Sequence, residues 1–211
     1  VAKYQQYRYE VRDYDTGDGS QDDDVIDQKL IQIDEDGREE VVVESIKNIY
    51  PNMDNMMFFV LAQPKGFLGV IVLGSTFRET SAGLRVIYML DLKKQELAPL
   101  SLNEIFTGYY FFEITPDERG MVWVRSEDDS GLEQQLYYSD FVIDTSRLIV
   151  ELQGEETFNA GMGGLGREYY NMKWIDNTAL EYAVYNHSAK VGDIEEEEIT
   201  DVFIEKRTVV L

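Results

Sequence analysis

Residues 109–125 read YYFFEITPDERGMVWVR, and this stretch decides the fold class. Two short runs rich in aromatic and β-branched residues lie on either side of a segment that contains proline, aspartate and glycine. Residues of these types favour strands and the tight turns between strands. Signals for helices are sparse in the rest of the chain. The stretch therefore predicts an antiparallel hairpin in an all-β protein.

The same order of features occurs several times along the 211 residues. Strand, early turn, strand, polar loop, strand, late turn and strand follow one another in units over 56–100, 109–152 and 168–211. A front unit over about 4–46 is incomplete because it lacks its opening strand. The late turns are predicted at Asp34–Gly37, Asp91–Lys94, Asp144–Arg147 and Glu205–Arg207. Such a repeat indicates stacked units of antiparallel four-stranded sheet, and we expect one all-β domain over 1–211.

Three motifs resemble those of a known family. Thr115-Pro116-Asp117 with Gly120 resembles the Ser-Pro-Asp-Gly turn of TolB-like secreted β-propellers, and Leu136-Tyr137-Tyr138-Ser139-Asp140 resembles their Leu-Tyr-x-x-Asp hairpin. The segment 86–91 resembles the same hairpin. The resemblance implies a propeller-like arrangement of the units, either small or partial. The alternative that the repeat leaves open is a β-sandwich.

The charge of the chain narrows the classes of partner. There are 41 acidic and 19 basic residues, and the formal net charge is −22. Such a charge repels phosphate backbones, so we expect no binding of nucleic acid.

No run of 18 apolar residues occurs, so we expect no membrane insertion. The chain has no cysteine, which excludes disulfides and cysteine nucleophiles.

The acidic segment 13–24 is a candidate calcium site. Calcium takes six to eight oxygen ligands, and closely spaced aspartates near glycines can supply them. The candidate ligands are Asp13, Asp15, Asp18, Asp22 and Asp24. The segment does not fit the EF-hand register, because its sixth position is Asp18 where that motif has glycine. A solvated loop without a metal is the other interpretation, and no other cofactor is expected.

The remaining motifs favour structural roles. Residues 161–166 fit the pattern G-x-G-x-x-G, but the chain continues as a predicted strand instead of the helix that a dinucleotide site needs. His187 is the only histidine, so it cannot form a multi-histidine metal site. Trp123 and Trp174 occupy comparable predicted strands, where packing is the favoured role. The run Glu195–Glu198 is interpreted as a solvated loop or a protected strand edge.

The sequence favours a non-catalytic binding or scaffolding module over an enzyme. No catalytic residue is assigned, and a protein partner is expected, although the sequence does not identify it. The resemblance implies an exported bacterial protein located outside the cell or in the periplasm, after removal of a leader or anchor. The alternatives are a calcium-stabilised surface or adhesion domain and a hydrolase or lyase with a carboxylate-based site.

Overall fold

The computed structural model describes residues 7–15, 26–46, 56–65, 67, 69–76, 85–104, 109–126, 134–158, 171–186 and 202–211. These residues form antiparallel sheets of three or four strands, which confirms the predicted all-β class and its four-stranded units. The chain divides into two compact units, Val1–Leu100 and Ser101–Leu211. No helix among the described residues has the length and apolar character of a membrane span.

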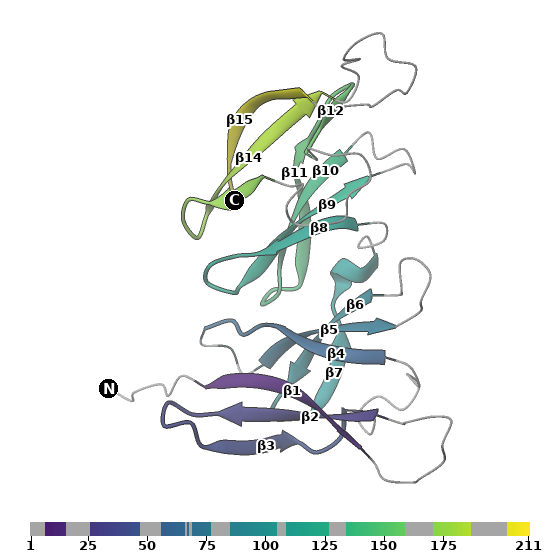
Figure 1. Cartoon of the computed structure of the whole chain (residues 1–211), viewed down its shortest axis with the longest axis vertical. Coiled ribbons are helices and arrows are strands. Elements are labelled where there is room, and N and C mark those ends of the chain that lie inside the picture. Colours follow the sequence, from purple (N-terminus) through teal and green to yellow (C-terminus); the bar gives the residue numbers. More distant parts are fainter. Residues whose placement is uncertain are drawn as a thin grey trace. The chain divides into compact units, whose positions relative to one another are not determined.

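The first unit contains two sheets, drawn in purple and blue in Figure 1. Strands β1 (Arg8–Asp15), β2 (Ile26–Ile33) and β3 (Glu39–Val43) form a three-stranded sheet in the order β1-β2-β3. Strands β4 (Met56–Ala62), β5 (Gly69–Thr76), β6 (Arg85–Asp91) and β7 (Glu96–Pro99) form the second sheet, also in chain order. Side chains from both sheets share one apolar core, which includes Tyr9, Leu30, Phe58, Val72 and Tyr88.

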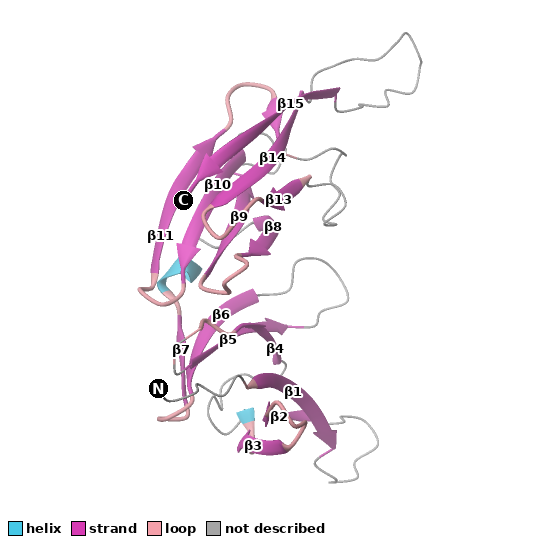
Figure 2. Ribbon diagram, turned by 90° about the vertical axis from the view of Figure 1, so that its left-hand side faces the viewer, coloured by secondary structure: helices cyan, strands magenta, loops and turns pink. Residues whose placement is uncertain are grey.

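The second unit also contains two sheets. A 3₁₀ turn, η1 (Ser101–Glu104), precedes β8 (Tyr109–Ile114), β9 (Gly120–Ser126), β10 (Gln134–Asp140) and β11 (Thr145–Glu151), which form the sheet β11-β10-β9-β8. In the other sheet, β14 (Ala179–Asn186) pairs with β12 (Glu156–Thr157), β13 (Met172–Trp174) and β15 (Val202–Val210). Figure 2 labels β13, β14 and β15 of this sheet, and Figure 1 labels β12. Their shared core includes Val122, Leu136, Phe158, Leu180 and Tyr182.

Aspartate carboxylates close the turns that follow the central strands. Asp34 Oδ1 accepts hydrogen bonds from the backbone N–H groups of residues 36 and 38, and Asp91 Oδ1 accepts them from residues 93 and 94. Asp140 Oδ1 does the same for residues 142 and 143. A short acceptor side chain that satisfies these N–H groups is the reason why aspartate starts such turns. The turn predicted at Asp34–Gly37 is confirmed, with Gly37 at a φ of 78°.

The late turn of the third sheet lies earlier than predicted. The repeat predicts this turn at Asp144–Arg147, but residues 141–144 form it and β11 begins at Thr145. Asp140 caps the turn, and Asp144 has the left-handed φ of 50° that ends it. Asp144 also accepts hydrogen bonds at Oδ1 from the N–H and hydroxyl of Ser101. The prediction named the aspartate that ends the turn instead of the one that starts it.

The same polar link joins the two sheets in each unit. In the first unit, the amide of the buried Gln28 on β2 accepts from the Phe58 N–H at 2.6 Å and donates to the Phe58 carbonyl at 3.3 Å. In the second unit, Gln134 Oε1 on β10 accepts from the Phe158 N–H at 2.7 Å. Both phenylalanines then contact a tyrosine of the central strand, with ring centroids 5.9 Å apart for Phe58–Tyr88 and 5.4 Å for Phe158–Tyr182.

The Gln134 link generates a stability prediction. Gln134→Ala removes the acceptor of a buried N–H and of the Thr157 hydroxyl, whose Oγ1 lies 3.0 Å from Gln134 Oε1. A buried donor without its acceptor costs about 1–3 kcal/mol, so we expect the free energy of unfolding to fall by about 2 kcal/mol. Urea denaturation measures this change. The exposed Gln153→Ala is the matched control, with an expected change below about 0.5 kcal/mol; equal losses would contradict the role of the link.

Gly120 generates a second prediction. A Cβ atom at this position would overlap the carbonyl oxygen of Ser139 and lie 2.9 Å from the Tyr138 ring. Gly120→Ala should therefore lower the free energy of unfolding by about 2–3 kcal/mol. In Gly37→Ala the new Cβ meets no atom within 4 Å, so only the left-handed backbone is strained, at about 1 kcal/mol. A smaller loss for Gly120→Ala than for Gly37→Ala in the same denaturation assay would contradict the predicted overlap.

Candidate functional site

Strand β15 offers a long hydrogen-bonding edge. It spans nine residues and, among the described strands, it pairs only with β14. The Leu211 N–H donates to the Thr178 carbonyl at 2.7 Å, which shows that the backbone hydrogen-bonding groups of residue 211 face β14. Because alternate residues of an antiparallel strand point to opposite edges, Lys206, Thr208 and Val210 direct their N–H and C=O groups away from β14.

The opposite edge of β14 supports this alternation. The Ala183 N–H donates to the Asn171 carbonyl at 3.0 Å, and the Ile175 N–H donates to the Ala179 carbonyl at 2.8 Å. The backbone N–H and C=O groups of Ala179 and Ala183 therefore face β13 and not β15. Their register partners on β15, Val210 and Lys206, consequently make no backbone hydrogen bond to them. A bulge interrupts the pairing between Val184 and Tyr185. From Lys206 to Val210 the register is regular, so the outward groups of this segment are evenly spaced.

Apolar side chains flank the outward segment. Phe203, Ile204 and Val210 are 53%, 44% and 71% exposed. The Phe203 ring also makes an edge contact with Tyr185 of β14, with centroids 5.9 Å apart. Exposed apolar groups on both sides of a free strand edge are the features that favour the addition of another strand.

Charged residues occupy the middle of β15, where the sequence analysis predicted a turn. That prediction, at Glu205–Arg207, is wrong, because these residues continue the strand opposite Val184, Ala183 and Tyr182. The Arg207 guanidinium binds both carboxylate oxygens of Glu156, at 2.6 and 3.0 Å, and its Nε donates to Glu205 at 2.7 Å. Lys206 Nζ donates to Glu181 at 2.8 Å. The segment has no glycine, proline or asparagine, and Arg207 and Lys206 each form an ion pair with another strand of the sheet.

The hydrogen bonds of these ion pairs shift the pKa of Glu156, Glu181 and Arg207. Hydrogen bonds from Arg207 hold the pKa of Glu156 below its ordinary value of 4.5, and those from Lys206 do the same for Glu181. The hydrogen bonds with Glu156 and Glu205 raise the pKa of Arg207. Burial raises the pKa of the Tyr182 phenol, which lies near this cluster. At neutral pH Glu156, Glu181 and Arg207 are therefore ionised and paired.

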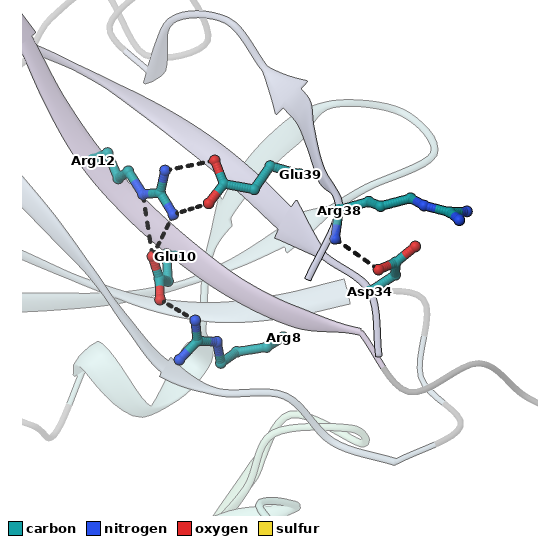
Figure 3. A network of polar contacts seen from close by, with 6 residues as sticks. All are labelled: Arg8, Glu10, Arg12, Asp34, Arg38 and Glu39. Carbon is teal, nitrogen blue, oxygen red and sulfur yellow. Dashed lines mark hydrogen bonds and ion pairs between the residues drawn. The ribbon is translucent and has the colours of Figure 1, made fainter. Parts of the chain in front are cut away.

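A similar arginine arrangement occurs on the first sheet, as Figure 3 shows. The Arg12 guanidinium on β1 binds both carboxylate oxygens of Glu39, at 2.7 and 2.8 Å, and its Nε donates to Glu10 at 3.1 Å. Arg8 also pairs with Glu10, at 2.8 Å. Ile31 and Ile33, which lie opposite Glu10 and Arg8, are buried. The charged side chains thus line the sheet face that bears these two isoleucines, where their alkyl stems can cover apolar surface.

The structure describes part of the predicted calcium segment. Asp13 and Asp15 lie in β1 instead of the expected loop, because β1 continues its pairing with β2 to Asp15. Asp13 Oδ1 accepts a hydrogen bond from Gln28 Nε2 at 2.8 Å. Asp18, Asp22 and Asp24 lie outside the described residues, and so do 161–166, His187 and Glu195–Glu198. Within the described ranges, no three acidic or histidine side chains are grouped to hold a metal ion. The calcium site stays a prediction.

The two tryptophans pack within the second unit. Trp123 is fully buried, stacks on Tyr137 with centroids 4.6 Å apart and donates from Nε1 to the Ser139 hydroxyl at 2.9 Å. Trp174 packs at the edge of the apolar core, and its Nε1 has no hydrogen-bond partner among the described residues. These contacts agree with the packing role that the sequence favoured.

Sequence reasoning missed the β15 edge. The available signal was weak: β-branched and aromatic residues lie on both sides of Glu205–Arg207, and no glycine, proline or asparagine interrupts 202–210. A unit of four strands over 168–211 requires a turn in the middle of this segment, and this requirement is the reason for the wrong prediction. The fourth sheet instead gains a strand from β12, which lies upstream of the expected unit.

The Glu156–Arg207 pair generates a prediction on pH. The lowered pKa of Glu156 means that its ionised form is favoured in the folded state, so its stabilisation is complete above the unfolded pKa and is lost as the pH falls through the folded pKa. We expect Glu156→Gln to reduce the free energy of unfolding by about 1 kcal/mol at pH 7. This difference from the wild type should shrink below about pH 4.

Urea denaturation between pH 3 and pH 8 measures this difference. The exposed Glu96→Gln makes the same chemical change outside the cluster, and its expected effect is below about 0.5 kcal/mol. A loss for Glu156→Gln that stays constant down to pH 3 would show that the ion pair is not its cause.

Comparison of the chain with protein-family models and with curated proteins found no match. The site on β15 combines an open strand edge, exposed apolar side chains and charges that are already paired.

Proposed function

We propose that this chain is a non-catalytic binding module that adds an extended segment of another protein as a new strand at the outer edge of β15. The observation that carries the proposal is the row of outward N–H and C=O groups at Lys206, Thr208 and Val210. Strand addition obtains its affinity from main-chain hydrogen bonds and its specificity from the side chains beside them. Exposed Phe203, Ile204 and Val210 supply apolar contacts next to this edge.

The state of the carboxylates supports binding over carboxylate-based catalysis. Where the pKa of an aspartate or glutamate is shifted among the described residues, it is lowered: Glu39, Asp91, Glu156, Asp176 and Glu181. The cause in each case is a hydrogen bond from an arginine, a lysine or the backbone. A general acid for glycoside cleavage needs the opposite shift. These five carboxylates therefore act as ionised acceptors that hold turns and strands in place.

The arrangement of sheets supports a propeller-like scaffold of the kind that the resemblance to TolB-like secreted propellers implies. Four antiparallel sheets follow one another in the chain, and three of them connect their strands in sequence order. Capping aspartates recur at Asp34, Asp91 and Asp140, each at the end of the strand that starts a late turn. We propose that the four sheets are blades of a propeller-like fold in an exported bacterial protein, whose exposed edge recognises its partner.

A peptide selection tests the proposed function. The full chain is used to select from a displayed library of random nine-residue peptides, and the selected peptides are measured against Thr208→Pro and Thr208→Ala. Proline removes the outward N–H at residue 208 and leaves the groups that face β14, whereas alanine keeps that N–H. We expect selected peptides to bind Thr208→Pro about tenfold more weakly and to bind Thr208→Ala as they bind the wild type.

The melting temperature of each variant shows whether it is folded. In hydrogen exchange, a bound peptide should protect the amides of Lys206, Thr208 and Val210. The proposed function fails if the selected peptides bind the two variants equally, or if no selected peptide protects these amides.

A further inference from the structure

We propose that the strand added at this edge is β15 of a second copy of this chain, in an antiparallel ladder whose two-fold axis passes through Lys206. The inference rests on the proposed function and names the partner. It follows from the sequence Ile204-Glu205-Lys206-Arg207-Thr208 around the axis, together with the outward direction of the backbone groups of Lys206 and Thr208. The two-fold makes the interface isologous, so each copy contributes the same five residues.

The backbone geometry fixes which registers are possible. Two strands can form a hydrogen-bonded ladder only when residues that point outward face one another. Lys206 and Thr208 point outward, so an axis at Lys206 lets the two Lys206 residues exchange both of their main-chain hydrogen bonds. Thr208 of each copy then lies opposite Ile204 of the other, at the end of the regular segment, because the bulge of β15 falls between Glu205 and Phe203.

The charges select the register at Lys206. With the axis there, Glu205 of each copy faces Arg207 of the other, which makes two cross-strand pairs of opposite charge. An axis at Arg207 would place Glu205 opposite Val209, and an axis at Thr208 would place Lys206 opposite Val210. Among two-fold registers with axes from Ile204 to Thr208, only the axis at Lys206 pairs the two opposite charges.

The side chains have donors and acceptors for the new contact. The guanidinium of Arg207 carries five N–H groups, and its bonds to Glu156 and Glu205 use three of them. Glu205 accepts its bond from Arg207 at Oε1, and its side chain is 53% exposed. A second copy can therefore add a carboxylate to each arginine while the Glu156 pair is kept.

Two charge repulsions oppose the ladder. An ion pair within each copy reduces the first, and salt reduces the second. The two Lys206 ammonium groups lie near the axis, but each already donates to Glu181 of its own copy at 2.8 Å. Each copy carries a formal net charge of −22, which repels a second copy at long range. Salt screens this repulsion beyond a Debye length of about 8 Å at physiological ionic strength. We therefore expect a weak dimer, with a dissociation constant of roughly 10 µM to 1 mM, because so short a ladder is small for an interface.

Strand β1 contains a second Glu-x-Arg sequence, Glu10-Val11-Arg12, and it is the competing partner for β15. The charged side chains of β1 have fewer free donors than those of β15, because Arg12 makes four hydrogen bonds to Glu10 and Glu39. Glu10 also pairs with Arg8 through its other oxygen. A contact between β15 of one copy and β1 of another would be head-to-tail, so it would give rings or open chains instead of a closed two-fold dimer.

Sedimentation velocity of the full chain at physiological ionic strength, over concentrations from about 5 µM to about 1 mM, tests the inference. We expect a monomer–dimer equilibrium that does not grow beyond twice the monomer mass. Thr208→Pro should weaken the dimer at least about tenfold, whereas Thr208→Ala should leave it unchanged within about twofold. Growth beyond the dimer would overturn the two-fold ladder in favour of the head-to-tail contact.

Charge reversal provides a second, independent test. Glu205→Arg places like charges opposite one another in both cross-strand pairs, so it should weaken the dimer more than Glu205→Gln does. Arg207→Glu places two glutamates opposite one another in both cross-strand pairs, so it should also weaken its own dimer. A mixture of Glu205→Arg with Arg207→Glu restores both pairs of opposite charge, so it should form a heterodimer although each variant alone is monomeric. Arg207→Glu also loses the Glu156 pair, so its melting temperature is measured first. If it is unfolded, the comparison of Glu205→Arg with Glu205→Gln decides.

The outcomes separate this inference from the proposed function. A wild-type chain that stays monomeric to about 1 mM, while selected peptides still bind at β15, would overturn the second copy as partner and leave strand addition standing. A dimer that is insensitive to Thr208→Pro and to Glu205→Arg would place the contact elsewhere and overturn the ladder. A monomer that also binds no Thr208-dependent peptide would remove both proposals.

Discussion

In each compact unit, the side-chain amide of a buried glutamine fixes the position of one sheet relative to the other. Burying main-chain groups between sheets requires a hydrogen-bond partner for each of them. Gln28 and Gln134 meet this requirement for Phe58 and Phe158, which lie where the next sheet begins. Apolar contacts alone would allow the sheets to slide, because they have no direction. The amide fixes one position, and the Phe–Tyr contacts of both cores follow from it.

The acidic composition serves this framework in several places. Carboxylates end the central strands at Asp34, Asp91 and Asp140, and a further aspartate, Asp176, caps the hairpin that leads into β14. Glu39 and Glu156 accept bidentate bonds from arginines on other strands. The large negative charge therefore cannot be equated with a large acidic surface that is open to cations. Part of it is already neutralised by the protein's own donors, and that part contributes to stability.

The local patterns in the sequence were sufficient to predict the class of fold. The turn at Asp34–Gly37 and the strands of 56–100 follow from short apolar runs that are separated by turn-forming residues. Both signals act over a few positions. The turn near Asp144 was displaced because two aspartates, Asp140 and Asp144, compete for the same role, and the backbone conformation that separates them depends on the pairing of β10 with β11. The segment 205–207 was predicted as a turn because the repeat requires a late turn at this place in the last unit. The partners of its two basic residues, Glu156 and Glu181, lie 51 and 25 residues away in sequence, so no local pattern could reveal them.

The shortness of β7 has a consequence for synthesis and misfolding. This last strand of the first unit spans four residues and ends at Pro99, which has no N–H to donate to a neighbouring chain. The first unit can therefore complete this sheet while the ribosome is still at work, without presenting a long template at β7 to other nascent chains. The nine-residue edge of β15 follows all other described strands in the sequence, so it forms only when they have already been made. The order of the strands thus delays the appearance of this nine-residue edge until the other described strands exist.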